Sequence, residues 1–213
     1  YLTYISILFH AIDGILLTIQ NKKARPIGYA KTNPSANTSF ASRNMAVLGT
    51  VILVFIATHM VNFWAKMHFD KNMPLMSITK DFYGEQKEFV FLTNGNQVPL
   101  DAEILKQNNL EFRGVDLYNI SDNFKLASAY KDLHKITFAF FKDPKYGLIA
   151  TIGYALAMLV LAFHLWHGFQ SAFQSIGLTH PAWNPRIKII GIAFSVLVPL
   201  LFAIIPIYIH LVK

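Results

Sequence analysis

Four long segments of the chain are almost continuously apolar, and polar stretches separate them. They comprise residues 1–19, 45–65, 147–169 and 187–212. Each is close to the roughly 20 residues with which an α-helix crosses about 30 Å of hydrocarbon. Only 15% of the 213 residues are charged, whereas about 25% are charged in soluble domains. The pattern predicts an all-α membrane protein, built as a transmembrane helical bundle with four visible helices.

This pattern divides the chain into three parts. Residues 1–65 contain the first two spans and the loop 20–44 between them. A polar insertion follows at 66–146, and residues 147–213 contain the last two spans. The chain begins at Tyr1 inside an apolar segment, so we expect a fifth helix to precede it in the intact protein.

The formal charge of +7 is a topology signal, and its distribution gives no reason to expect a nucleic acid partner. Loop 20–44 carries five basic and no acidic residues, and loop 177–187 also lacks acidic residues. The stretch 66–145 has 11 basic and 11 acidic residues. Because short basic loops stay in the cytoplasm, we expect these two loops to be cytoplasmic and the insertion to be extracytoplasmic.

The insertion contains short amphipathic stretches at 102–110 and 124–133. The dipeptides Asn94-Gly95 and Arg113-Gly114 predict turns. We expect a small cap on the outer ends of the helices. A docking surface for another subunit is the alternative.

No cysteine occurs in the chain, which excludes disulfides, thiolate-held metal clusters and cysteine-attached haem. Histidine is therefore the main candidate metal ligand, and a histidine inside a membrane span is a functional candidate by default. His10 lies about 15 Å above the cytoplasmic end of its span, and His164 about 28 Å below the outer end of its own, so both fall in the cytoplasmic half. His59 lies about 24 Å above Arg43, in the outer half.

Two histidines at one depth on different helices could hold one haem iron from both sides. Gly14 and Gly168 each follow such a histidine by four residues, and therefore share its helix face. Small residues there would let a flat macrocycle approach the helix, and Gly153 could make room for a second haem higher in the membrane. Interhelical hydrogen bonding by the histidines is the simpler alternative.

Three further residues lie close to this level of the membrane. His167, one turn after His164, is a rival ligand. Arg43 is the first candidate among the cytoplasmic cations for binding a haem propionate. Asp13 is the one acidic residue within a span, and we expect it to be protonated or paired with His167 or Arg43. It would act as a proton carrier or, more simply, as an interhelical hydrogen-bonding group.

Several motifs together resemble a known family, the single-chain di-haem cytochrome b anchor of succinate dehydrogenase and fumarate reductase, in its Bacteroidetes-type form. They are HAIDG (10–14) leading into QNKKARP (20–26), RNMAVLG (43–49), THMVNFW (58–64), and HLWHG (164–168) followed by SAFQSIG (171–177). The resemblance covers nearly all of the membrane part. It does not extend to the 66–146 insertion.

The resemblance implies five helices that hold two haems b, each between two histidines. His10 and His164 would bind the haem nearer the cytoplasm, with His164 preferred to His167. His59 would bind the outer haem, whose other ligand lies on the family's first helix. It also implies a bacterial inner membrane, in which electrons would pass between an iron–sulfur subunit and a quinone, with menaquinone expected. A flavoprotein subunit would interconvert succinate and fumarate in the respiratory chain and tricarboxylic acid cycle.

Two other functions share some of these features. One is the cytochrome b anchor of another quinone-linked enzyme, such as a hydrogenase or formate dehydrogenase. The other is a proton-coupled transporter without haem, in which Asp13 and the histidines form a proton relay.

Overall fold

The structure is a computed structural model that describes residues 1–27, 33 and 39–212. Four helices in these ranges are long and apolar enough to cross a membrane, which confirms the four predicted spans and indicates a multi-pass membrane protein. They are α1 (Leu2–Ala24), the continuous helix Met45–Phe69, α8 (Gly147–Ser175) and α9 (Asn184–Leu211). Lys31, one of the predicted cytoplasmic cations, lies outside the described residues.

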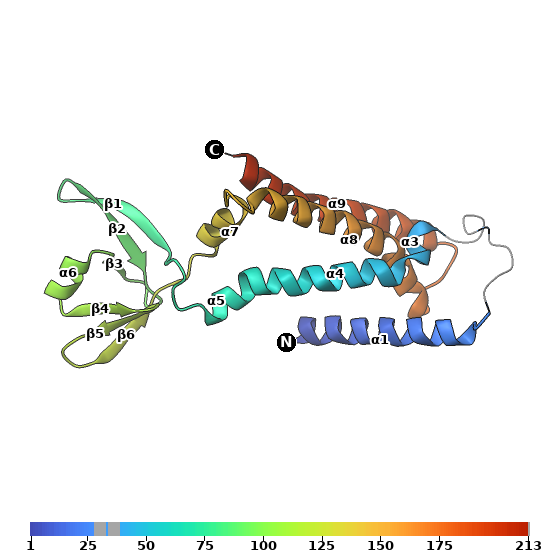
Figure 1. The fold of residues 1–213 in the computed structure, drawn as a ribbon, viewed down its shortest axis with the longest axis horizontal. Helices are drawn as coiled ribbons and strands as arrows, with labels where there is room; N and C mark the ends of the chain where they lie inside the picture. The colour runs from blue at the N-terminus through green and yellow to red at the C-terminus, as the bar shows by residue number, and fades with distance from the viewer. Residues whose placement is uncertain (28–32, 34–38, 213) are drawn as a thin grey trace. The chain divides into compact units, whose positions relative to one another are not determined.

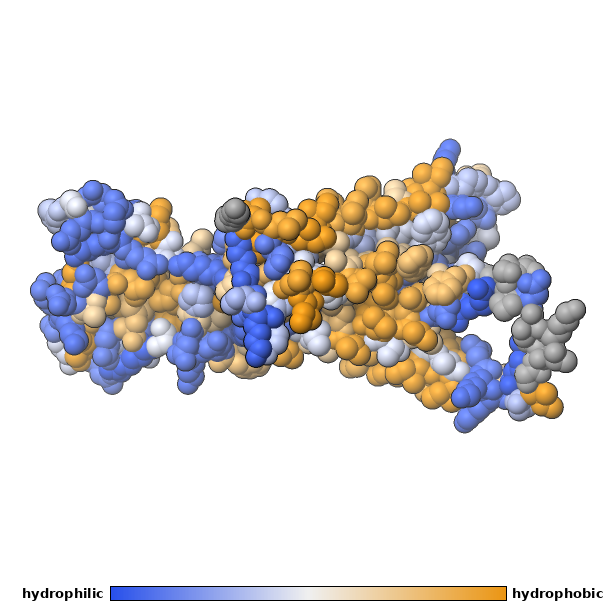
Figure 2. Space-filling view, turned by 45° about the horizontal axis from the view of Figure 1, so that its top comes forward, coloured by the Kyte–Doolittle hydropathy of each residue, from blue (hydrophilic) through white to orange (hydrophobic). Residues whose placement is uncertain are grey.

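The chain forms two compact units. One consists of Tyr1–Thr58 and Pro144–Lys213 and contains most of the four spans; we call it the membrane unit. The other, His59–Asp143, contains the end of the second span and almost all of the polar insertion; we call it the β-rich unit. Hydrophobic side chains dominate the surface of the spans, whereas hydrophilic side chains are frequent on the sheets (Figure 2).

Within the membrane unit, α8 and α9 form the most extensive helix–helix contact. Gly191 of α9 is buried against the Phe169 ring, and a Cβ there would lie 2.7 Å from that ring. The absence of a side chain therefore permits the close approach of α9 to α8. Phe169 also contacts Phe194, with ring centroids 5.6 Å apart.

The first part of the second span, α4 (Met45–His59), runs antiparallel to α8 (Figure 1). Met45 lies against Gly168, and ten residues later Phe55 contacts Tyr154 with ring centroids 5.0 Å apart. A short helix, α3 (Phe40–Arg43), precedes α4, and its Phe40 ring lies 6.4 Å from that of Phe163 on α8.

Helix α1 has no buried residue along its 23 positions. Ile5, Leu8 and Phe9, for example, are 65%, 62% and 72% exposed. The helix is stable in a membrane because its backbone groups bond to one another and its apolar side chains face hydrocarbon. Its wide exposed surface also leaves room for groups other than this chain's own helices to pack on it.

The all-α expectation is wrong for the polar insertion, which contains two three-stranded antiparallel sheets (Figure 1). The first sheet consists of β1 (Ser77–Phe82), β2 (Glu85–Phe91) and β3 (Gln97–Pro99), and the second of β4 (Leu110–Arg113), β5 (Asp116–Asn119) and β6 (Phe124–Ser128). In β4, for example, Leu110 and Phe112 lie two residues apart, so their apolar side chains share one face of the strand and pack against a common core.

These apolar side chains form a core that belongs to the β-rich unit alone. Val90 is fully buried, and Leu117 is 2% exposed. The core cluster is completed by Leu92, Leu105, Ala127 and Ala129. The predicted turns are confirmed: Gly95 follows β2 with a φ of 85°, and Gly114 joins β4 to β5 with a φ of 65°. Glycine is favoured at both positions because L side chains rarely adopt positive φ.

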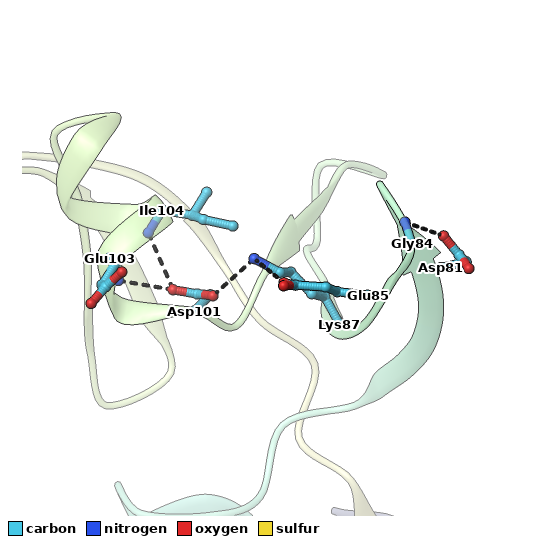
Figure 3. Close-up of polar contacts among 7 residues, drawn as sticks. All are labelled: Asp81, Gly84, Glu85, Lys87, Asp101, Glu103 and Ile104. Carbon is cyan, nitrogen blue, oxygen red and sulfur yellow. Dashed lines mark hydrogen bonds and ion pairs between the residues drawn. The ribbon is translucent and has the colours of Figure 1, made fainter.

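The short helix α6 (Ala102–Gln107) begins with a side-chain cap. The Asp101 carboxylate accepts hydrogen bonds from the backbone N–H groups of Ile104 and Glu103, at 3.3 and 2.9 Å (Figure 3). These bonds lower the pKa of Asp101 below its ordinary value. Lys87 on β2 forms an ion pair with the same carboxylate at 3.3 Å, which links the sheet to the helix.

The second span ends in an unusual helical geometry. Residues Met60–Ala65 form a π-helix, η1, and α5 (Lys66–Phe69) follows it. Phe63 of η1 is buried against Phe140 and Phe141 of α7 (Leu133–Phe141), with ring centroids 5.3 and 6.3 Å apart. The last carbonyls of this span are capped by the Lys131 ammonium, which donates to Met67 O and Asp70 O at 2.5 and 3.0 Å.

Candidate functional site

A pair of histidines connects two membrane-spanning helices of the membrane unit. The rings of His10 on α1 and His164 on α8 have centroids 6.1 Å apart and planes at 89°. These are two of the three histidines that the sequence places at functional depths. They come together although the rest of α1 buries no side chain.

The two rings differ in their surroundings. His10 is exposed on α1, whereas His164 is half-buried on α8. The side of the His164 ring that carries Nδ1 faces Gly49 on α4, where an ideal Cβ would lie 3.5 Å from Cε1 and 4.0 Å from Nδ1. The Nδ1 atom is buried, so Nε2 is the ring nitrogen that remains open for a ligand.

This geometry fits a metal held between two imidazoles. Two imidazoles bound at roughly 2 Å on opposite sides of one metal ion have ring centroids about 6 Å apart, close to the separation of His10 and His164. Gly14, one turn from His10, has open space where a side chain would be. No cluster of three or more histidine and acidic side chains that could hold a bare metal ion occurs among the described residues. Two histidines alone leave positions on a metal that a prosthetic group could fill.

The remaining residues that the sequence singles out lie in varied environments. Gly168 faces the Met45 side chain of α4, at 3.4 Å from an ideal Cβ, and Gly153 has open space around it. The backbone carbonyl of His167 accepts a hydrogen bond from the Ser171 hydroxyl at 3.1 Å. His167 is half-buried on α8.

Asp13 and Arg43, both expected near the inner site, do not pair with each other in the structure. Asp13 is exposed on α1, and its carboxylate makes no hydrogen bond or ion pair with any residue that the structure describes. Arg43 is the last residue of α3, separated from α4 by Asn44. Arg43 therefore belongs to the short helix before the second span, and not to the span itself.

His59 belongs to the β-rich unit and immediately precedes the π-helix η1. Its ring lies 5.2 Å from the ring of Phe63, one turn later, with the planes inclined at 50°. Phe63 of η1 is buried against Phe140 of α7, and this packing anchors the helical turn that follows His59. π-Helical turns are frequent at functional sites, which agrees with a ligand role for His59.

Sequence patterns did not reveal two features of this site. Gly49 is a single glycine in a long apolar run, and only the antiparallel packing of α4 on α8 places it beside His164. The π-helix could not be predicted from hydropathy, because an apolar segment does not show how many residues each of its helical turns contains. The chain matches no protein-family model, no curated protein and no solved structure.

Proposed function

We propose that this chain is a haem b membrane-anchor subunit of a succinate:quinone oxidoreductase in a bacterial inner membrane. The observation that carries the haem assignment is the approach of His10 to His164 at 6.1 Å between two membrane-spanning helices. The assignment of succinate and fumarate as substrates of the complex rests on the resemblance of the motifs around these histidines to the di-haem anchor family.

The chain's own residues would bind and shield the prosthetic group. Haem b, when bound, accepts and releases one electron at a time. His10 and His164 would hold its iron from α1 and α8, and the open space at Gly14 would admit the macrocycle. His59 would supply a ligand for a second haem. Arg43 and the neighbouring basic residues would bind propionates.

The complete reaction requires partner subunits. Oxidation of succinate to fumarate releases two electrons and two protons, and reduction of a quinone to a quinol consumes two of each. The dicarboxylate chemistry would take place on a flavoprotein subunit. An iron–sulfur subunit would carry the electrons to this chain, which would contribute part of the quinone site, with menaquinone as the expected quinone.

The first test is a visible spectrum of the purified complex. Bis-histidine haem b gives sharp bands on reduction, and a proton-coupled transporter without haem gives none. Haem quantification should yield two haems b per copy of the intact chain. Absence of haem from the intact complex would refute the proposal and favour the proton-relay alternative.

The second test identifies the electron donor. The complex should contain iron–sulfur and flavoprotein subunits, and succinate should reduce both its haem and an added menaquinone analogue. Hydrogen and formate serve as matched alternative donors. If only one of these reduces the haem, the chain is the anchor of a different quinone-linked enzyme.

A further inference from the structure

The Nδ1 atom of His164 is buried in the membrane unit without a hydrogen-bond partner among the described residues. A histidine that binds a metal through one ring nitrogen usually donates a hydrogen bond from the other, to a carboxylate, a backbone carbonyl or water. Such a bond fixes the ring and makes it a stronger electron donor to the metal. His164 departs from this pattern.

Another histidine of the same chain illustrates the bond that His164 lacks. The Nδ1 of His68 in α5 lies 2.8 Å from the backbone carbonyl oxygen of Trp64, four residues earlier. Because a carbonyl only accepts, the His68 Nδ1 must carry the proton and donate it. The carbonyl four residues back is thus within reach of a helical histidine, but the His164 ring is turned away from it toward α4.

Gly49 is the residue that this nitrogen meets on α4. An ideal Cβ at Gly49 would lie 4.0 Å from Nδ1 and 3.5 Å from Cε1, which is ordinary van der Waals contact. The site therefore has room for the methyl side chain of alanine or the hydroxymethyl side chain of serine, whereas glycine has no side chain. The side of α4 that faces Nδ1 presents no polar side-chain atom at this position.

On the basis of the proposed haem ligation, we infer that Gly49 tunes the inner haem by withholding a hydrogen-bond acceptor from His164. An imidazole whose Nδ1–H has no acceptor is less basic, and so stabilises the oxidised iron less. The result is a higher reduction potential for the inner haem. Gly49 is a positioning residue in this account, because it acts only through His164.

Substitution of Gly49 by serine would supply the acceptor. A serine hydroxyl extends one bond beyond the Cβ and comes within hydrogen-bonding reach, about 3 Å, of Nδ1. Its own proton can bond the Met45 carbonyl four residues earlier, as the Thr50 hydroxyl of the same helix bonds Ala46 O at 2.8 Å. A hydroxyl can donate one bond and still accept another, so the two bonds are compatible.

The experiment is a potentiometric titration of the intact complex carrying wild-type chain, Gly49→Ser or Gly49→Ala. The serine variant should lower the midpoint potential of the inner haem. The alanine variant, which adds the same Cβ without an acceptor, should leave it unchanged. The outer haem serves as an internal reference in all three proteins. Equal shifts in both variants, or no shift in the serine variant, would overturn the inference while leaving haem binding established.

A second measurement, on the wild-type complex, tests the inference if the serine variant fails to bind haem. In the reduced, low-spin wild-type complex labelled with ¹⁵N-histidine, the His164 Nδ1–H signal, identified by its proximity to the Gly49 Hα protons, should show no hydrogen bond to an acceptor. A hydrogen-bonded Nδ1–H would contradict the inference. Absence of haem from the wild-type complex would instead refute the proposed function itself.

Discussion

The two units of this chain stabilise themselves in different ways. The β-rich unit encloses its own hydrophobic core, in which Val90 is fully buried and Leu117 is 2% exposed. In the membrane unit, α1 buries no residue, and α8 and α9 are packed mainly on each other. Burial of apolar surface away from water drives the folding of the first. The helices of the second satisfy their backbone groups internally and expose their remaining apolar side chains to lipid.

This difference suggests where each unit should be sensitive to substitution. Changes to single core residues should weaken the β-rich unit without affecting a cofactor. Changes to single histidines of the spans should remove a cofactor without unfolding the helices. The following predictions test that distinction, in order of decreasing effect.

The largest effect is expected at His164. On the proposed ligation, its replacement by alanine should abolish the inner haem, because His10 would remain as the only histidine ligand. His167→Ala, three residues later on the same helix, is the matched control and should retain the haem. The measurement is the reduced-minus-oxidised spectrum with haem quantification. Loss of haem in the His167 variant and retention in the His164 variant would reverse the ligand assignment.

An intermediate effect is expected at His59, which precedes the π-helix. On the proposed ligation, His59→Ala should reduce the haem content of the complex from two to one, because His59 would bind only the outer haem. His134→Ala, outside the spans on α7, should keep both haems. An unchanged haem content in the His59 variant would refute the ligand role of this histidine.

A smaller effect, confined to the β-rich unit, is expected at Leu117. Leu117→Ala should lower the free energy of unfolding of this unit by about 2–5 kcal/mol, because a buried side chain is lost and a cavity remains. Leu126→Ala is the control, since Leu126 is 45% exposed. Denaturant-dependent hydrogen exchange of β2 and β5 amides measures the change. A haem spectrum altered by Leu117→Ala would contradict the separation of the two units.

The smallest expected effect concerns the pH dependence of the stability of the β-rich unit. Hydrogen bonding to Lys125 and Ser128 lowers the pKa of Asp116 below its ordinary value. A lowered pKa stabilises the folded unit above the ordinary aspartate pKa of about 4, and this contribution is lost as the pH falls through the folded-state pKa.

Asp116→Asn should therefore make the stability of the β-rich unit less dependent on pH in the acidic range. Asp122→Asn provides a matched control, since the Asp122 carboxylate makes no hydrogen bond or ion pair within the described residues. The measurement is thermal unfolding of the unit at several acidic pH values. Equal pH dependence in the wild type and the Asp116 variant would refute this assignment.

The secondary structure of the two units could be predicted from the sequence to different extents. Long apolar runs are sufficient to define membrane spans, because a membrane requires about 20 consecutive apolar residues whatever their neighbours. The strands of the insertion, in contrast, are three to seven residues long. Their alternation is short and ambiguous until the strands pair, and only their turns at Gly95 and Gly114 were evident beforehand.

The candidate site was partly predictable for a similar reason. Helix rise places His10 and His164 at a common depth, but depth says nothing about rotation around the helix axis. The contact of His164 with Gly49 depends on that rotation, and on which helix packs against α8. Neither can be read from one span alone.

The π-helix at the end of the second span has a consequence for the evolution of this chain. A π-helical turn accommodates one additional residue within an α-helix, and one residue corresponds to a rotation of about 100°. Removal of a single residue from Met60–Ala65 would therefore turn Trp64 and His68 to a new direction, while His59 and the helix before it would keep theirs. An insertion of this kind lets selection change the direction of the outer end of a span independently of the histidine that precedes it.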